Sequence, residues 1–453
     1  MKKHVLSVLV GLTLSASASV AYADDLAQVF QLALQNDPTL QQVDAQRRAA
    51  QKGVDISKAA FWPQLNLSAG YSRSESESAT YDSVAQSFIV IDSENRGWNA
   101  GVNLSQTIFD MNVWDRAELS EKQAYQAEVN YLSTRQQLML RVVNAYFTVL
   151  ERQDDLAFAT AEKNAIERQL EQTKQRFSVG LTAITDVHEA QAQYDTSVAA
   201  EIQARNAVEI AQESLREITG RYHESLASLN TDSFSPEAPT PADATQWVKV
   251  AEDKNLQLIV QRVAVEIAEH QIDLARNGHL PTVSLSGSYS TRDTTTTARG
   301  NKIDMPRMDS NSIGLNLNVP IFSGFRTSAE VDQAREFYVA SSQELEGVRR
   351  SVERQVRNAY YDVVASQASI RAFEQAVVSA ESALKATQTG FEVGTRTIVD
   401  VLDSTRNLYN ARRNLSKARY GYIRQYLTLK QASGQISEQD LIAINASLIH
   451  ENS

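Results

Sequence analysis

"GTRTIVDVLD" at residues 394–403 repeats the pattern of "GLTAITDVHE" at residues 180–189, 214 positions earlier. Each copy begins with a glycine, has an isoleucine four positions later and ends with two acids three positions apart. Each copy also lies within a long proline-free stretch that is rich in Ala, Gln, Glu, Arg and Leu. Because such stretches form long helices and glycine permits a tight turn between them, each decapeptide predicts the turn of a helical hairpin.

The prolines place four long helices. None of the eight prolines lies between Pro63 and Pro236 or after Pro320. The predicted helices cover about 110–177 and 185–218 in the first half of the chain, and about 324–391 and 398–432 in the second. At 1.5 Å per residue the longest reaches about 100 Å, which is longer than a single globular core. The two hairpin turns are therefore expected far from the rest of the chain.

Four shorter segments, two before each hairpin, alternate between apolar and small polar residues, as in QLNLSAGYSR. A period of two predicts strands, at about 64–73, 98–108, 282–290 and 312–320. One apolar face and one small, uncharged face are typical of transmembrane β-strands, although a half-buried sheet of a soluble protein shows the same alternation. Loops rich in Ser, Thr and charge at 73–97 and 291–311 favour the membrane. Because lipid does not tolerate open sheet edges, four strands would have to share a barrel with other chains.

Steady offsets between the two halves, such as Pro63 to Pro281 and Phe177 to Phe391, indicate an internal duplication. Three prolines in "SPEAPTPAD" mark a linker between the copies. The predicted divisions are a signal peptide at 1–23, a first repeat at 24–230, a Pro-rich linker at 231–243, a second repeat at 244–435 and a C-terminal tail at 436–453.

The N-terminal segment has the pattern of a secretory signal peptide. Lys2 and Lys3 precede a short apolar run that ends in Ala21-Tyr22-Ala23, so cleavage is expected after Ala23. No cysteine occurs, which excludes disulfides, cysteine metal sites and a lipid-modified N-terminal cysteine. A formal net charge of -11 gives no basic surface for nucleic acid.

No catalytic or metal-binding pattern stands out, and we expect no enzyme activity and no cofactor. A Gly-x-Ser-x-Gly motif is absent. The histidines after the signal show no close pair at metal-ligand spacing, and we expect them at the surface or in packing contacts. They are His188, His223, His270, His279 and His450.

The stretches "QRFSVGLTAITDV", "GFEVGTRTIVDVLDSTRNLYNAR", "SQTIFDMNVW" and "LNVPIFSG", with the duplicated plan, resemble the TolC family of outer membrane efflux proteins. The resemblance extends to about residue 445. It implies an α+β membrane protein: a homotrimer whose 12-stranded transmembrane β-barrel continues into a 12-helix periplasmic α-barrel. It also implies a location in the outer membrane, in contact with its lipid and spanning into the periplasm.

The function implied by this resemblance is that of a passive exit duct. Such a duct serves tripartite efflux pumps and type I secretion, and opens at its periplasmic end when partners dock. The implied partners are a periplasmic adaptor, or membrane fusion, protein and an inner membrane transporter of the RND, ABC or MFS class. The alternative is a periplasmic coiled-coil adaptor or interaction protein without a pore, which would not need the four alternating strands.

By the same resemblance, Asp400 and Asp403 form the narrowest ring of the pore. Residues three apart share a helix face, so three chains would direct six carboxylates into one constriction that attracts cations. Crowding would raise the pKa of some of them. The alternative is structural, because Thr397 and Asp400 have the spacing of a capping box at a helix start.

The resemblance also places a gate at the hairpin tips. Arg396 would tie the second hairpin to its neighbours through Thr185 and Asp186. Close relatives carry a tyrosine where Phe391 stands, and phenylalanine has no hydroxyl to bond Asp186. Glu189 adds a second acid to the first copy. Both departures predict a gate that is held less tightly, or by other residues.

The turns themselves are the expected docking points for the adaptor. A tight turn between helices requires a glycine in any case, so this role rests on the resemblance alone. The residues concerned are Val179, Gly180, Leu181, Val393, Gly394 and Thr395.

Overall fold

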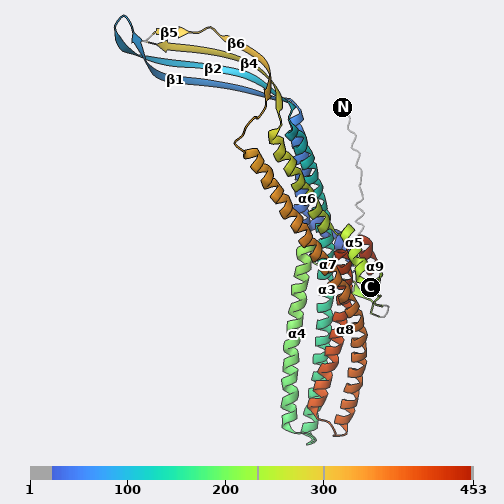
Figure 1. Ribbon diagram of the computed structural model, residues 1–453. Helices are drawn as coiled ribbons and strands as arrows, with labels where there is room; N and C mark the ends of the chain where they lie inside the picture. The colour runs from blue at the N-terminus through green and yellow to red at the C-terminus, as the bar shows by residue number, and fades with distance from the viewer. Residues whose placement is uncertain (1–22, 232–233, 299–300, 450–453) are drawn as a thin grey trace, which may run out of the picture.

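The computed structural model describes residues 23–231, 234–298 and 301–449. Residues 1–22, which make up all but the last position of the predicted signal peptide, and His450 lie outside the described residues. The described chain is elongated (Figure 1): a β-sheet occupies one end, long helices run away from it, and two helical hairpins finish at the opposite end.

Four long helices build the two hairpins: α3 (Met111–Ser178), α4 (Ile184–Thr219), α7 (Arg326–Glu392) and α8 (Ile398–Ala432). Each begins and ends within two residues of its predicted bounds. At the start of α3, the Asp110 carboxylate accepts a hydrogen bond from the Asn112 N–H at 3.0 Å. At the end of α4, Gly220 has a φ of +77°, a conformation that favours glycine. No described helix combines the length and the apolar character needed to cross a membrane.

Two further helix pairs, which the sequence did not predict, precede the strands: α1 (Leu26–Asn36) with α2 (Pro38–Lys58), and α5 (Ala244–Lys254) with α6 (Leu256–Arg276). Asp37 and Asn255 join the helices of each pair with nearly the same backbone angles, φ -65° and ψ 116° against φ -68° and ψ 119°. Each side chain also caps the helix that follows, by accepting from Leu40 N–H and Gln257 N–H. The duplicated unit therefore includes a helix pair in addition to the strands and the hairpin.

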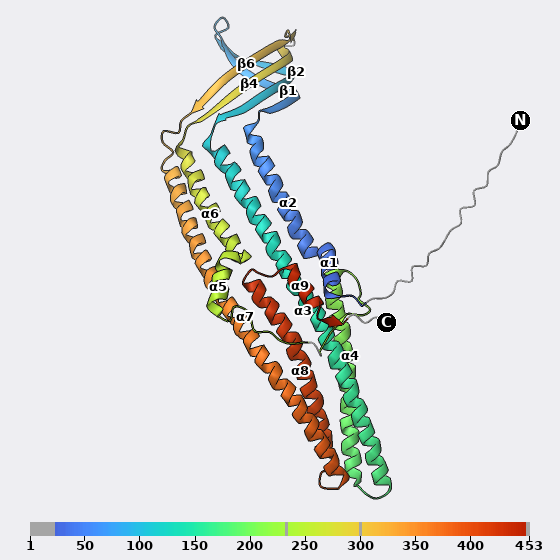
Figure 2. The same cartoon turned by 90° about the vertical axis from the view of Figure 1, so that its right-hand side faces the viewer.

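The helices α2 and α6 continue toward the sheet from the ends of α4 and α8, the second helix of each hairpin. Asn36 Nδ2 donates to the carbonyl of Thr219, the last residue of α4, at 3.0 Å. Asn255 Nδ2 donates to the carbonyl of Ala432, the last residue of α8, at 2.8 Å. As a result, α2 packs beside the part of α3 nearest the sheet, and α6 packs beside the corresponding part of α7 (Figure 2).

The sheet consists of β1 (Gln64–Asp82), β2 (Ser87–Phe109), β4 (Thr282–Ala298), β5 (Asn301–Asp304) and β6 (Met308–Asn318). The pairing is antiparallel throughout, in the order β1, β2, β4 and β6, with β5 on the end of β4. The segments 73–97 and 291–311, predicted as loops, are largely strand. The ladder continues there through polar pairs such as Ser76 and Ser93, whose hydroxyl oxygens lie 2.9 Å apart. Such pairs leave no alternation of apolar and polar residues in the sequence. β6 stops short of its predicted end because Pro320 has no N–H to pair.

One face of the sheet carries exposed apolar side chains. Tyr71 lies opposite Trp98 and Leu65 opposite Leu104, so these four side chains point to the same face. Tyr71, Trp98 and Leu65 are 69%, 60% and 68% exposed. Among the described strands, β1 pairs with β2 alone and β6 with β4 alone, so both outer edges of the sheet are open in the single chain.

The segment predicted as a C-terminal tail, 436–453, is folded over most of its length. It forms α9 (Glu438–Asn445) and β7 (Leu448–Ile449), and β7 pairs antiparallel with β3 (Ser228–Leu229). Leu441 of α9 is 1% exposed and belongs to the main core. Burial of this side chain fixes a terminus that would otherwise be poorly ordered.

The main core lies at mid-length, where α1, α3, α8 and α9 meet. Tyr146 and Phe147 of α3 are fully buried there, with their rings edge to face and 5.5 Å between the centroids. Tyr146 Oη donates to the carbonyl of Ala227 at 2.8 Å. This bond satisfies both a buried hydroxyl and a buried carbonyl, which otherwise destabilise a fold.

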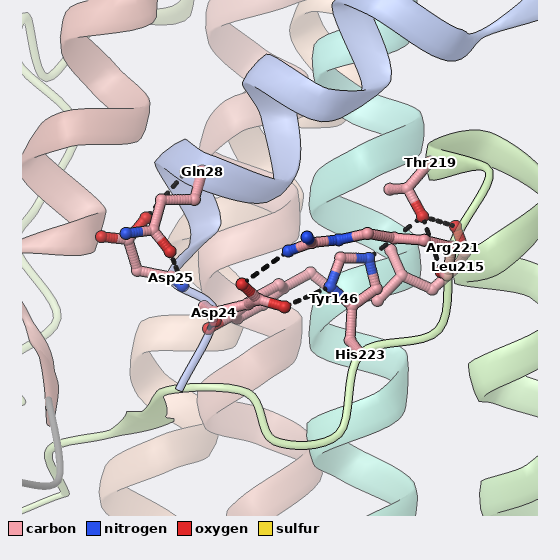
Figure 3. A network of polar contacts seen from close by, with 8 residues as sticks. All are labelled: Asp24, Asp25, Gln28, Tyr146, Leu215, Thr219, Arg221 and His223. Carbon is pink, nitrogen blue, oxygen red and sulfur yellow. Dashed lines mark hydrogen bonds and ion pairs between the residues drawn. The ribbon is translucent and has the colours of Figure 1, made fainter. Parts of the chain in front are cut away.

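A polar network beside this core fixes the start of the described chain (Figure 3). The Asp24 carboxylate accepts from Arg221 at 2.8 Å and lies 2.7 Å from His223 Nδ1. His223 Nε2 lies 3.0 Å from Thr219 Oγ1. His223 is 7% exposed, so it is one of the packing residues that the sequence predicts, and both nitrogens of its buried imidazole have hydrogen-bond partners.

We predict that Tyr146→Phe lowers the free energy of unfolding by about 1–3 kcal/mol, because it leaves the buried Ala227 carbonyl without this donor while keeping the ring in place. Thermal and denaturant unfolding followed by circular dichroism measure the change. Tyr125→Phe, on the same helix but 55% exposed, is the matched control and should leave stability unchanged. Equal stabilities for the two variants would contradict the prediction.

Candidate functional site

The two hairpin tips have the same backbone geometry. Gly180 and Gly394 have φ values of +79° and +80°, where any side chain would be strained. The N–H of Leu181 donates to the Arg176 carbonyl at 2.8 Å, and the corresponding bond closes the second turn at the same distance. Each repeated decapeptide thus begins with the turn of a hairpin.

The tips expose apolar side chains at the end of the molecule farthest from the sheet. Val179, Leu181 and Val393 are 68%, 69% and 70% exposed. All six positions predicted to dock an adaptor are exposed: Val179, Gly180, Leu181, Val393, Gly394 and Thr395. Exposed apolar groups gathered in one place are typical of contact surfaces, and the docking role stays a prediction.

Asp400 forms the capping box that its spacing predicts. Its carboxylate accepts from the Thr397 N–H at 2.8 Å, and the Asp400 N–H donates to Thr397 Oγ1 at 3.3 Å. The Thr397 hydroxyl also donates to this carboxylate at 2.9 Å. The two bonds that Thr397 donates to the carboxylate, with the nearby charge of Arg396, lower the pKa of Asp400. Asp403, one turn further, is exposed and pairs with Arg406 at 2.8 Å. The predicted rise in pKa concerns a ring from three chains; within one chain the direction for Asp400 is downward.

The predicted gate link joins Arg396 to Thr185 and Asp186. Arg396 and Thr185 are exposed, and the Asp186 carboxylate accepts a hydrogen bond from the Thr182 hydroxyl. Within the described residues of this single chain, Arg396 makes no ion pair with Asp186. Glu189 is exposed one turn after Asp186. The gate link therefore stays a prediction about contacts between chains.

Phe391 is buried between the two hairpins near their tips. It is 7% exposed, and the guanidinium carbon of Arg176 lies 4.6 Å from the centre of its ring. Phenylalanine at position 391 has no hydroxyl to bond Asp186, and its ring contacts Arg176 and apolar side chains of the neighbouring helices. The buried cluster around it contains Ile166, Leu170, Ala190, Phe391, Ile398, Val401 and Leu402.

Between this tip cluster and the main core, acidic side chains of α3 face basic and hydroxyl side chains of α8. The ion pairs are Glu151–Arg424 at 2.7 Å, Asp155–Lys417 at 3.5 Å and Glu162–Arg413 at 2.9 Å. Asp154 accepts from the hydroxyls of Ser416 and Tyr420. Burial raises the pKa of Asp154, and these two hydrogen bonds oppose the shift. The hairpins are thus joined by a polar seam along α3 and α8.

The sequence did not single out Arg176 or Asp154. A basic residue in the last turn of a helix, as Arg176 is, also interacts favourably with the helix dipole, so its presence alone gave no signal of a further role. Asp154 lies 262 positions from Ser416, beyond any local pattern. In the part of the chain that the structure describes, no group of three or more His, Asp or Glu side chains is arranged to hold a metal ion.

The sequence pattern of the family described as outer membrane efflux protein matches residues 29–221 and 247–435. The outer membrane protein TolC of Vibrio cholerae is 44% identical over 446 residues, which cover 98% of this chain and 99% of that protein. TolC of Escherichia coli is 42% identical over 452 residues, covering 98% and 89%. The proteases secretion protein PrtF of Dickeya chrysanthemi is 28% identical over 442 residues, covering 97% and 94%.

Solved structures share the fold. CusC, in crystal structures described as showing folding and transmembrane channel formation, superposes with a TM-score of 0.75 at 17% identity, over 90% of this chain and 92% of CusC. The outer membrane protein VceC of Vibrio cholerae superposes with a TM-score of 0.71 at 20% identity, over 90% and 96%. At these identities the likeness concerns the fold alone.

We predict that Gly394→Ala loosens the second tip, because alanine at a φ of +80° is strained by about 1–2 kcal/mol. Hydrogen exchange of the backbone amides at 389–400 should become faster. Gly347→Ala is the control, since this glycine lies inside α7 with open space around it, and alanine should stabilise that helix by about 0.5–1 kcal/mol. Unchanged exchange at the tip in Gly394→Ala would refute the strain.

We predict that the buried carboxyl group of Asp154 makes the stability of the protein depend on pH. Its pKa is raised above the ordinary 3.8, so its contribution to stability is complete below that pH and is lost as the pH rises through the raised value. Asp154→Asn does not titrate and should lose less stability over this interval, as seen in melting temperatures recorded from pH 3.5 upward. Glu171→Gln, an exposed change on the same helix, should keep the wild-type profile; an identical profile for Asp154→Asn would contradict the assignment.

Proposed function

This chain belongs to the outer membrane efflux protein family, and from that membership we propose that it serves as an outer membrane exit duct for efflux and for type I secretion. The observation that carries the proposal is the combination, in one chain, of an exposed apolar sheet at one end and long helical hairpins at the other. The family is named for efflux, and one relative is named for the secretion of proteases, which supports both roles, efflux and protein secretion.

The duct would be a homotrimer. A sheet with two open edges and an exposed apolar face cannot stand in lipid as a single chain, because unpaired backbone groups are not satisfied there. Three copies would join β1 of one chain to β6 of the next and close a 12-stranded barrel. The four lines of helix below each sheet would then form a 12-helix periplasmic barrel that continues the pore.

The hairpin tips would form the periplasmic entrance. Asp400 and Asp403 would line its narrowest point, where carboxylates from three chains attract cations and repel anions. Arg396 would tie neighbouring chains through Thr185 and Asp186 while the duct is closed. Opening would follow when a periplasmic adaptor protein docks at the exposed tips, with an inner membrane transporter of the RND, ABC or MFS class as the source of energy.

A periplasmic adaptor or other coiled-coil interaction protein without a pore is the second candidate. It would share the helical hairpins. The exposed apolar face of the sheet disfavours it, because a soluble protein would bury side chains such as Tyr71 and Trp98.

Planar-bilayer recordings test the duct and its entrance together. We predict a small, cation-selective conductance for the wild type, and lost cation selectivity in Asp400→Asn/Asp403→Asn, because the neutral variant no longer concentrates cations at the constriction. Glu171→Gln removes a carboxylate near the tip of the first hairpin and should leave selectivity unchanged.

Each result separates the alternatives. If no channel forms, the interaction protein without a pore becomes the better account. If a channel forms and the double variant keeps wild-type selectivity, the duct stands and the two aspartates act in helix capping and ion pairing alone.

A further inference from the structure

The two hairpins are joined near their tips by one small cluster and one cation. Phe391 is the buried residue that α7 contributes to this cluster, and it packs with side chains of α3, α4 and α8. Arg176, in the last turn of α3, places its guanidinium over the Phe391 ring, with the guanidinium carbon 4.6 Å from the ring centre. Arg176 lies four residues before Gly180 and Phe391 three residues before Gly394, so this contact lies close to both turns.

The surroundings of Arg176 favour this contact over an ion pair. In the part of the chain that the structure describes, Arg176 has no salt bridge, and its Nε is buried without a hydrogen-bond partner. A guanidinium within about 6 Å of an aromatic ring is attracted by the ring, and more strongly where water is excluded. The attraction needs a ring face and no hydroxyl, so phenylalanine serves as well as tyrosine.

We propose that Arg176 is a latch that holds the second hairpin tip against the first through the Phe391 ring, and thereby keeps the periplasmic entrance closed. The proposal rests on the proposed function and adds to it a residue on the first hairpin. The contact needs no hydroxyl at position 391, because the ring itself is the group that is held.

The Arg176–Phe391 contact lies far from the ion pairs that join α3 and α8, so a small rotation of the second hairpin would move it by the largest distance. The seam along α3 and α8 reaches from Arg424 to Arg413, and the start of α8 lies about 40 Å beyond Arg424 at 1.5 Å per residue. A rotation of about 5° about the Glu151–Arg424 pair would move the tip by about 3–4 Å. That displacement separates a guanidinium from a ring, whereas ion pairs close to the pivot move far less. The latch would therefore release first when the tip moves.

Two variants remove the contact in different ways, and single-channel recordings in planar bilayers report the result. Arg176→Gln removes the cation and keeps most of the side-chain length. Phe391→Leu removes the ring and keeps an apolar side chain, without any change of charge. We expect each to raise the open fraction roughly tenfold, which corresponds to about 1.4 kcal/mol. The combination should add little to either single variant, because both remove the same contact.

Three controls isolate the latch. Arg168→Gln removes the same charge from an exposed position of α3 and should leave the open fraction unchanged. Arg176→Lys keeps a cation and should restore part of the closure. Phe391→Tyr keeps the ring and should stay closed. Melting temperatures close to the wild-type value in all variants would separate a local release from a general loss of folding.

Hydrogen exchange at 389–398 gives a second readout that does not depend on a pore. Faster exchange in Arg176→Gln and Phe391→Leu, with no change in Arg168→Gln, would support the contact. If the wild type forms no channel, the proposed duct fails while the exchange data still judge the contact. If the wild type conducts and Arg176→Gln gates and exchanges like Arg168→Gln, the latch is refuted and the duct is retained.

Discussion

The unpaired backbone groups along β1 and β6 are the constraint on which the rest of the molecule depends. One chain supplies a sheet with an apolar face and two open edges, and neither feature is stable alone in lipid or in water. In the proposed trimer, copies of the chain that complete the sheet would also bring their helices side by side. Such contacts would cover apolar side chains that one chain leaves exposed on its helices, such as Ile202 and Ile210 of α4 at 64% and 59%.

The elements that sequence reasoning predicted are those with strong local signals. Long proline-free stretches and a glycine at each turn were enough to bound α3, α4, α7 and α8. The helix pairs before β1 and before β4 were missed. Asp37 and Asn255 each end one helix and cap the next, so a single residue both ends a helix and begins another. The strands were predicted too short because their outer parts do not alternate. The stretch SRSESES at 72–78 of β1 is polar on both faces, and near its start β2 has the continuous apolar run FIVI at 88–91.

The candidate site divides in the same way. The Thr397–Asp400 capping box is a contact between near neighbours, and its spacing alone predicted it. The Arg176–Phe391 contact joins residues 215 positions apart, and the Asp154 contacts with Ser416 and Tyr420 span still more of the chain. Such pairs depend on how two hairpins pack, which no local pattern encodes. The duplication gives both hairpins one backbone plan, while these cross-hairpin contacts make the two copies unequal.

The chemistry of the contacts between the hairpins changes along their length. At mid-length the core holds them with fully buried side chains such as Tyr146 and Leu427, whose separation would expose large apolar areas to water. Toward the tips the contacts between α3 and α8 become ion pairs and hydroxyl bonds, such as Glu162–Arg413, Asp155–Lys417 and Asp154–Ser416. At the tips the seven-residue cluster and one cation remain. Because this cluster is much smaller than the main core, separating the tips would expose less apolar area than separating the core, so the tips could part while the core stays intact.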